Sequence, residues 1–191
     1  MASSLARSWT VRYDGRGVSV IPESGKWFWG LELTRFGIAG QDQIVSTPLD
    51  CTAEGRHVSY DWSASLTEWY INHDRGLEHG YTVHARPAAD IECGGPLRFE
   101  LAVRGGLQPQ IQNHGRDVGF IDATGATALR YDGLVAFDAD GRLLPARFDA
   151  IGDALRLTVD DAGARYPLTI DPLVQQSYFK APVSAGAHFG Y

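Results

Sequence analysis

The sequence lacks the features that mark several large classes of protein. No apolar run approaches the roughly 18 residues of a membrane-spanning helix. Residues 1–9 lack the apolar core, about seven residues or more, of a secretory signal. Basic residues form no cluster, and 17 Lys and Arg against 23 Asp and Glu give a net charge of −6. This balance argues against a nucleic-acid-binding surface. We expect either a cytoplasmic protein or an exported one whose signal is missing from this chain.

Motifs of common metal and catalytic centres are also missing. The sequence has no Cys-x-x-Cys, no His pair at helical spacing beside Glu, no Gly-x-Ser-x-Gly and no Gly-rich phosphate loop. His79 and His84 are five residues apart, so on a strand they point to opposite faces. The turn at 138–141 lacks the further acids of an EF-hand, because Ala136 and Arg147 stand in their places. We therefore predict no metal, no cofactor and no catalytic residue in this chain.

Cysteine is scarce, with Cys51 and Cys93 as the only two. In an exported protein they can form a disulfide that closes a loop of about 42 residues, worth roughly 4 kcal/mol. Two unpaired thiols are the alternative, because free cysteine is commonly buried. The chain is long enough to fold without such a cross-link.

What the sequence does contain is short alternating strands. Leu97, Phe99, Leu101 and Val103 alternate strictly with polar or small residues. Strand patterns recur about every 8 to 12 residues in the second half. Three turns, at 122–125, 138–141 and 160–163, each begin with Asp and end with Gly, which suits a hairpin. These patterns predict an all-β, antiparallel β-sandwich built of successive hairpins.

The stretch at 166–172 is expected to organise the end of this sandwich. Its apolar residues alternate as in a strand. Pro167 has no amide hydrogen, so that part of the strand is predicted to lie at a sheet edge or opposite a gap. Pro172 is predicted to end the pairing and send the chain out of the sandwich. The residues of this motif are Tyr166, Pro167, Ile170, Asp171 and Pro172.

Three segments together resemble one known module. They read EWYIN and RGLEHGYT within 68–82, LRYDGL and DADGR within 129–142, and VDDAGARYPLTIDP at 159–172. They are similar to the N-terminal β module of bacterial FG-GAP (integrin-α-like) repeat proteins, and more distantly to the module that precedes SBBP-type propeller repeats. The similarity extends over roughly residues 27–180.

The resemblance implies an organisation and a setting. Residues 1–26 would be an N-terminal extension, 27–172 the β-sandwich, and 173–191 a linker that begins an FG-GAP blade at Phe189-Gly190. Calcium would bind only in repeats downstream of this chain. The module would be extracellular or at a cell surface, as a non-catalytic cap and spacer beside a β-propeller in an adhesion or binding protein. A surface protein or polysaccharide is the external partner expected on this basis.

The residues alone also allow two other functions, saccharide binding and glycoside hydrolysis. Exposed aromatic rings can bind saccharides by stacking, whereas buried ones fill the core or contact the next domain. The candidate platform consists of Trp27, Trp29, Trp62, Trp69 and Tyr70. Glu68 and Glu78 are the candidate carboxylate pair of a glycosidase, with a structural ion pair as the alternative.

Overall fold

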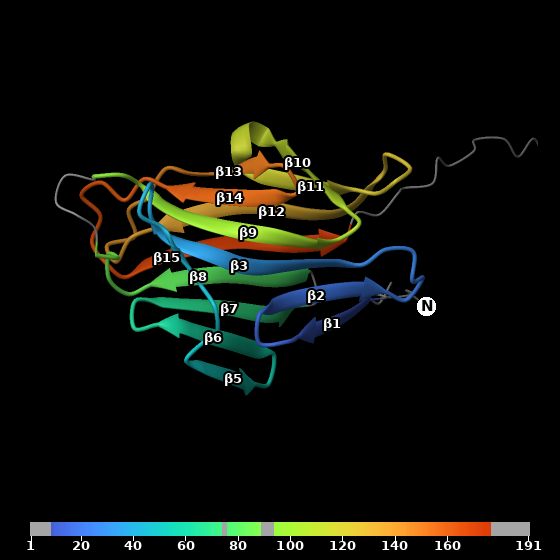
Figure 1. The fold of residues 1–191 in the computed structure, drawn as a ribbon, viewed down its shortest axis with the longest axis horizontal. Coiled ribbons are helices and arrows are strands. Elements are labelled where there is room, and N and C mark those ends of the chain that lie inside the picture. Colours follow the sequence, from blue (N-terminus) through green and yellow to red (C-terminus); the bar gives the residue numbers. More distant parts are fainter. Residues whose placement is uncertain (1–8, 74–75, 89–93, 177–191) are drawn as a thin grey trace, which may run out of the picture.

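The computed structural model describes residues 9–73, 76–88 and 94–176, which form two antiparallel β-sheets packed face to face (Figure 1). These residues contain no α-helix and a single short 3-10 turn. The predicted all-β, antiparallel sandwich is therefore confirmed. Within the same residues no helix is long and apolar enough to cross a membrane.

The first sheet has seven strands in the order β1-β2-β3-β9-β14-β13, with β4 beside β3. Their bounds are β1 (Trp9–Tyr13), β2 (Gly17–Pro22), β3 (Trp29–Ile38), β4 (Gln43–Ile44), β9 (Leu97–Gly105), β13 (Ala146–Ile151) and β14 (Ala154–Val159). The predicted alternation of β9 is observed, with Leu97, Phe99 and Leu101 fully buried.

The second sheet has eight strands in the order β10-β11-β12-β15-β8-β7-β6-β5. Their bounds are β5 (Asp50–Glu54), β6 (His57–Ser63), β7 (Leu66–His73), β8 (Gly76–Val83), β10 (Gln108–Gln112), β11 (Asp117–Ile121), β12 (Thr127–Phe137) and β15 (Leu168–Gln176). The 3-10 turn η1 (Asn113–Gly115) joins β10 to β11. The core lies between the two sheets and contains large aromatic rings from both.

The Asp-to-Gly turns have the predicted local chemistry, but only one of them joins two strands that pair with each other. Each first aspartate accepts backbone N–H bonds within its turn: Asp122 from Thr124, Asp138 from Asp140 and Asp160 from Ala162. The first turn joins the paired strands β11 and β12. The other two carry the chain between sheets, from β12 to β13 and from β14 to β15. A turn fixes a local reversal of the chain, but it does not choose the partner strand.

The motif at 166–172 leads into the interior of a sheet, so its predicted place at an edge is wrong. β15 pairs with β12 on one side and with β8 on the other. Pro167 precedes the strand, after a cis peptide bond, so its missing N–H costs no ladder bond. Pro172 does not end the pairing, which continues to Gln176.

A β-bulge in β12 explains how Pro172 is accommodated. The register of β12 against β15 shifts between Asp132 and Val135. There the Gly133 N–H binds the Asp117 carboxylate, and the Leu134 N–H binds the Arg116 carbonyl. The ladder is therefore interrupted where proline has no hydrogen to donate, as is usual for proline within sheets.

The sandwich also begins earlier than the resemblance implies. β1 pairs with β2, and β2 pairs with β3, so residues from Trp9 onward belong to the first sheet and are not an extension. Val18 and Val20 are fully buried in the core. At the other end, the predicted linker from 173 is in β15 as far as Gln176, and the predicted blade start at Phe189-Gly190 lies outside the described residues.

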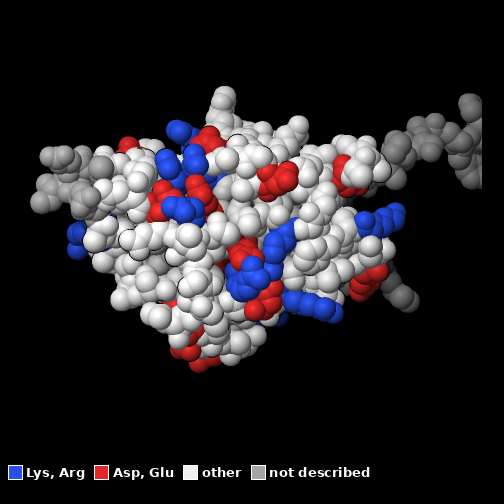
Figure 2. All heavy atoms as spheres, viewed as in Figure 1, with Lys and Arg blue, Asp and Glu red and all other residues white. Residues whose placement is uncertain are grey.

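The outer face of the first sheet carries clusters of compensated charges (Figure 2). Ion pairs link Arg35 to Asp42 and to Glu100, and others link Arg104 to Asp14 and to Glu32. Figure 2 shows the two signs mixed in clusters on this face. No extended surface of one sign is available there for a polyelectrolyte.

Candidate functional site

The five candidate platform residues separate into core and surface. Trp29 and Tyr70 are fully buried, and Trp62 is 7% exposed. These three rings have no free face for a ligand, so the alternative assignment to the core holds for them. Trp27 is partly buried and packs against the core. Trp69 is also partly buried but lies outside the core cluster, on the outer face of the second sheet.

Trp69 lies across the neighbouring strand at a glycine. It pairs in register with Gly80 of β8. A Cβ atom at Gly80 would lie 2.2 Å from Trp69 Cζ2 and 2.5 Å from Cη2, so the six-membered ring of the indole lies directly on this residue. The indole Nε1–H donates to Thr82 Oγ1 at 3.2 Å. The ring is thus held against the sheet at two points, and its opposite side faces outward.

Acidic side chains border this ring on the far side of β8. The register of β15 against β8 places Asp171 opposite Gly80, in the same row as Trp69. Glu78, two residues from Gly80 on the same face, is within hydrogen-bonding reach of Asp171. Burial and the nearby Glu78 carboxylate raise the pKa of Asp171 to about 6. His73, on β7, is hydrogen-bonded through Nε2 to the Glu78 carboxylate.

Glu68 lies on the opposite face of the second sheet, inside the core. It is 1% exposed, and His79 is fully buried. Its carboxylate accepts hydrogen bonds from Trp62 Nε1 at 2.9 Å and Tyr81 Oη at 3.0 Å, and it lies 2.8 Å from His79 Nε2. The Tyr131 hydroxyl lies 2.7 Å from His79 Nδ1. This set of polar contacts connects four strands, β6, β7, β8 and β12.

Both ring nitrogens of His79 have partners in this buried network. The Tyr131 hydroxyl is paired with Nδ1, and the Glu68 carboxyl group is paired with Nε2. Burial, followed by the Glu68 charge, raises the pKa of Tyr81 well above its ordinary value, so that the phenol remains a donor. Tyr70 stacks on His79 with ring centres 4.6 Å apart, although its hydroxyl makes no hydrogen bond of good geometry to the Glu68 carboxylate nearby.

The glycosidase hypothesis required Glu68 and Glu78 to converge, and they do not. Glu68 points into the core, whereas Glu78 is on the outer face of the same sheet. Two carboxylates on opposite faces of a sheet cannot flank one glycosidic bond. The described residues also contain no group of three or more His, Cys, Asp or Glu arranged to hold a metal ion.

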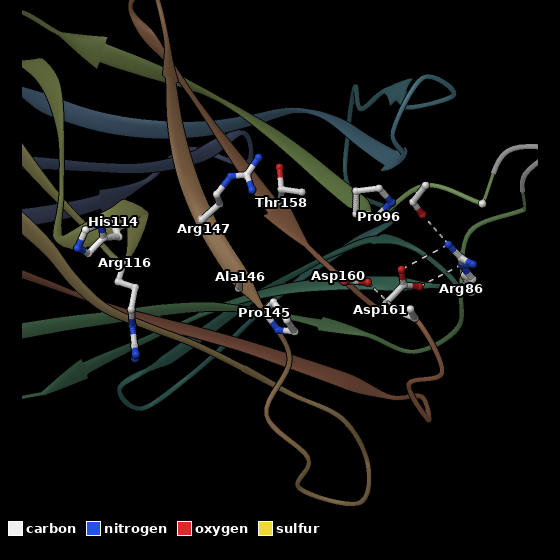
Figure 3. Close-up of a pocket in the computed structure, with 13 residues that line it drawn as sticks. Arg86, Pro96, His114, Arg116, Pro145, Ala146, Arg147, Thr158, Asp160 and Asp161 are labelled. Carbon is white, nitrogen blue, oxygen red and sulfur yellow. Dashed lines mark hydrogen bonds and ion pairs between the residues drawn. The ribbon is translucent and has the colours of Figure 1, made fainter.

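An open groove of about 830 Å³ lies in the described surface (Figure 3). Its walls include Arg86, Arg116 and Arg147 beside Pro145 and Ala146. Each arginine already has an acceptor: Asp161 for Arg86 at 3.0 Å, the Leu134 carbonyl for Arg116 at 3.3 Å, and Asp149 for Arg147 at 3.2 Å. The groove therefore has basic walls whose charge is largely compensated.

Strained backbone forms one end of this groove. Asn113 and His114 have left-handed φ values of 47° and 55°, which are uncommon for residues with a Cβ atom. Gly115 follows with a φ of 88°, and a Cβ atom at this residue would lie 2.9 Å from the Phe148 carbonyl oxygen. The close approach of η1 to β13 accounts for the glycine and brings His114 to the groove wall.

The cysteine pair and Tyr166 are the remaining candidates from the sequence. Cys51 is exposed on β5, and Cys93 lies outside the described residues, so their pairing stays a prediction. Tyr166, from the motif at 166–172, donates to Asp161 at 2.7 Å and helps to hold that carboxylate beside Arg86. Sequence reasoning missed Gly80, Thr82 and Asp171 as neighbours of Trp69.

No known protein family, curated protein or solved structure matches the chain. The resemblance to FG-GAP repeat modules therefore stays a prediction that depends on the sequence segments alone.

Proposed function

We propose that this chain is a non-catalytic module of an exported repeat protein, which supports and covers the first blade of a β-propeller that follows it. The observation that carries the proposal is the position of β15. This last described strand lies between β12 and β8 and is bonded to both. A following domain would thus be attached to the centre of a sheet, where local unfolding is more costly than at a free edge.

The end of the sandwich from which the chain leaves also carries apolar surface. Figure 1 shows β9 and β15 pointing to the same end. A Cβ at Gly105, the last residue of β9, would lie 2.0 Å from the Phe28 carbonyl oxygen, so residues 27–28 lie against this end. Phe28 is 39% exposed and follows the half-buried Trp27. Exposed aromatic side chains are typical contacts between domains.

Outer strands of a propeller blade need protection against edge-to-edge pairing, and a neighbouring domain can provide it. The buried position of Glu68 and its separation from Glu78 are consistent with a module that has a structural and binding role. Export and the adjoining propeller come from the resemblance. The coding sequence on both sides of the chain tests them directly: a signal upstream and FG-GAP blades downstream are expected, and an unrelated sequence would overturn the setting.

The coupling between the domains can be tested in the protein that includes the blades. Phe28→Ser should separate one cooperative unfolding transition into two, while leaving the unfolding of the sandwich alone nearly unchanged. Leu143→Ser is the matched control, because Leu143 is 71% exposed and is bridged to Phe137, at the opposite end of β12 from the Gln176 exit. Two independent transitions in the unsubstituted protein would show that the sandwich does not support the propeller.

A further inference from the structure

We infer that the outer face of the second sheet around Trp69 is a binding site for neutral saccharides whose ring hydroxyls are all equatorial. This inference goes beyond the role proposed above and does not depend on it. Three structural features carry it: the orientation of the Trp69 ring, the glycine beneath it and the acceptors along its border.

The ring orientation is the first feature. Of the five tryptophans, Trp29 and Trp62 are in the core and Trp9 and Trp27 pack against it, which leaves Trp69 as the one on the outer face. The six-membered ring of the indole lies over Gly80, and Trp69 is only partly buried, so the side of the ring that faces away from the sheet is available to a ligand. A pyranose with equatorial hydroxyls presents only C–H bonds on its two faces, and such a face stacks on an indole.

The glycine is the second feature, because it makes the platform rigid before a ligand arrives. A side chain at Gly80 would meet both Cζ2 and Cη2 of Trp69 within 2.5 Å and would push the ring away from the sheet. The hydrogen bond from Nε1 to Thr82 fixes the ring in its plane. A ligand would therefore bind without first ordering a large side chain, which lowers the entropic cost of association.

The acceptors are the third feature. Asp171 lies in the same cross-strand row as Trp69 and Gly80, and Glu78 lies in the adjacent row of the same face. Carboxylates accept hydrogen bonds from vicinal hydroxyl groups and fix the orientation of a sugar that is stacked beside them. Their negative charge repels acidic sugars, so the ligand expected is uncharged. Thr82 borders the ring on the other side.

The same geometry also has a purely structural explanation, and the experiment must distinguish that explanation from saccharide binding. An aromatic ring across a glycine on a neighbouring strand shields the exposed backbone and stabilises a sheet. That role predicts a loss of stability on removing Trp69 but no affinity for any saccharide. Binding measurements on folded variants distinguish the two explanations.

The test uses the full chain with three hexasaccharides: cellohexaose, a mannohexaose with axial hydroxyls, and a hexagalacturonate that carries charge. Calorimetric titration should detect cellohexaose and show at least about tenfold weaker binding of the other two, as expected for losing one stacked contact or adding charge repulsion. The indole N–H resonance of Trp69 should shift on addition of cellohexaose.

Variants locate the site. Trp69→Ala should weaken cellohexaose binding at least about tenfold, and Trp69→Phe should retain part of it. Gly80→Ala keeps the indole but displaces it, so it should also weaken binding. Phe28→Ala, which removes another exposed ring, should leave the affinity unchanged. Near-ultraviolet circular dichroism checks that each variant is folded. Failure of the unsubstituted chain to bind cellohexaose, or equal binding by Trp69→Ala, would overturn the inference.

Discussion

The Glu68 carboxylate lies 2.8 Å from the imidazole of His79, and both side chains are almost wholly removed from solvent between the two sheets. Trp62 and Tyr81 also donate to this carboxylate, and Tyr131 binds the other nitrogen of the imidazole. A buried network of this kind is favourable only when each polar group has a partner. Its members come from four strands, β6, β7, β8 and β12, so it also specifies how the middle of the second sheet is assembled.

Truncation of the central carboxylate should be strongly destabilising. Glu68→Ala removes the acceptor of two donors and leaves the imidazole without its partner, so we expect a loss of about 3–5 kcal/mol in the free energy of unfolding. Urea denaturation measures this loss. Glu54→Ala, at an exposed position on the edge strand β5, should change stability by no more than about 0.5 kcal/mol. Equal effects of the two substitutions would show that the buried network contributes nothing specific.

Gly80→Ala should destabilise the chain by about 1–3 kcal/mol, because the added methyl group meets the Trp69 ring and the Ile170 carbonyl. In a Trp69→Ala background the same change should cost less, since only the contact 2.5 Å from the Ile170 oxygen remains. A double-mutant cycle from denaturation curves gives the coupling between the two residues. Additive effects would mean that the indole does not lie on the glycine in solution.

The free energy of unfolding should fall as the pH rises from about 4 to about 6, because Asp171 loses its proton in this range. Its pKa in the folded chain is raised to about 6 by burial and by the Glu78 carboxylate, so folding favours the protonated form. The stabilisation is complete below the ordinary pKa of an aspartate and is lost as the pH passes through the raised value. Because the group is only half-buried, we expect about 1 kcal/mol after allowance for solvent screening.

Asp171→Asn should remove this part of the pH dependence and make the chain more stable than the unsubstituted one at pH 7. Unfolding measured at several pH values between 4 and 7 compares the two proteins. Asp149→Asn, an exposed aspartate on β13, serves as the control. A pH profile of Asp171→Asn that matches the unsubstituted chain would exclude crowding of Asp171 and Glu78.

His114→Gly should leave the chain equally stable or up to about 1 kcal/mol more stable. The left-handed φ of 55° is costly for histidine and free of strain for glycine, although glycine loses more backbone entropy on folding. Gly115→Ala should have the opposite effect, because its Cβ would meet the Phe148 backbone. Thermal unfolding compares the two. A marked loss of stability in His114→Gly would indicate that the imidazole makes contacts that stabilise the turn.

The sequence predicted only that Trp69 was a candidate ring for stacking. The structure pairs β7 with β8, and the pairing of His73 with Gly76 sets Trp69 opposite Gly80. The sequence does not determine which face of the sheet each of these side chains occupies. Trp69 and Tyr70 are adjacent and must point opposite ways, but which of them enters the core depends on the sheet that packs above them. Asp171 is 102 positions from Trp69 in the sequence and joins the site only through the pairing of β15 with β8.

Local patterns in this chain suffice for the strand character, the alternation of β9 and the hydrogen-bonded turns that begin with Asp122, Asp138 and Asp160. Each depends on residues a few positions apart, whose side-chain directions and backbone bonds follow from strand and turn geometry. The tertiary structure alone decides which sheet a strand joins, why Pro172 is tolerated inside one, and that Glu68 is buried. Those outcomes depend on contacts between strands that are distant in sequence, and packing of the two faces selects among them.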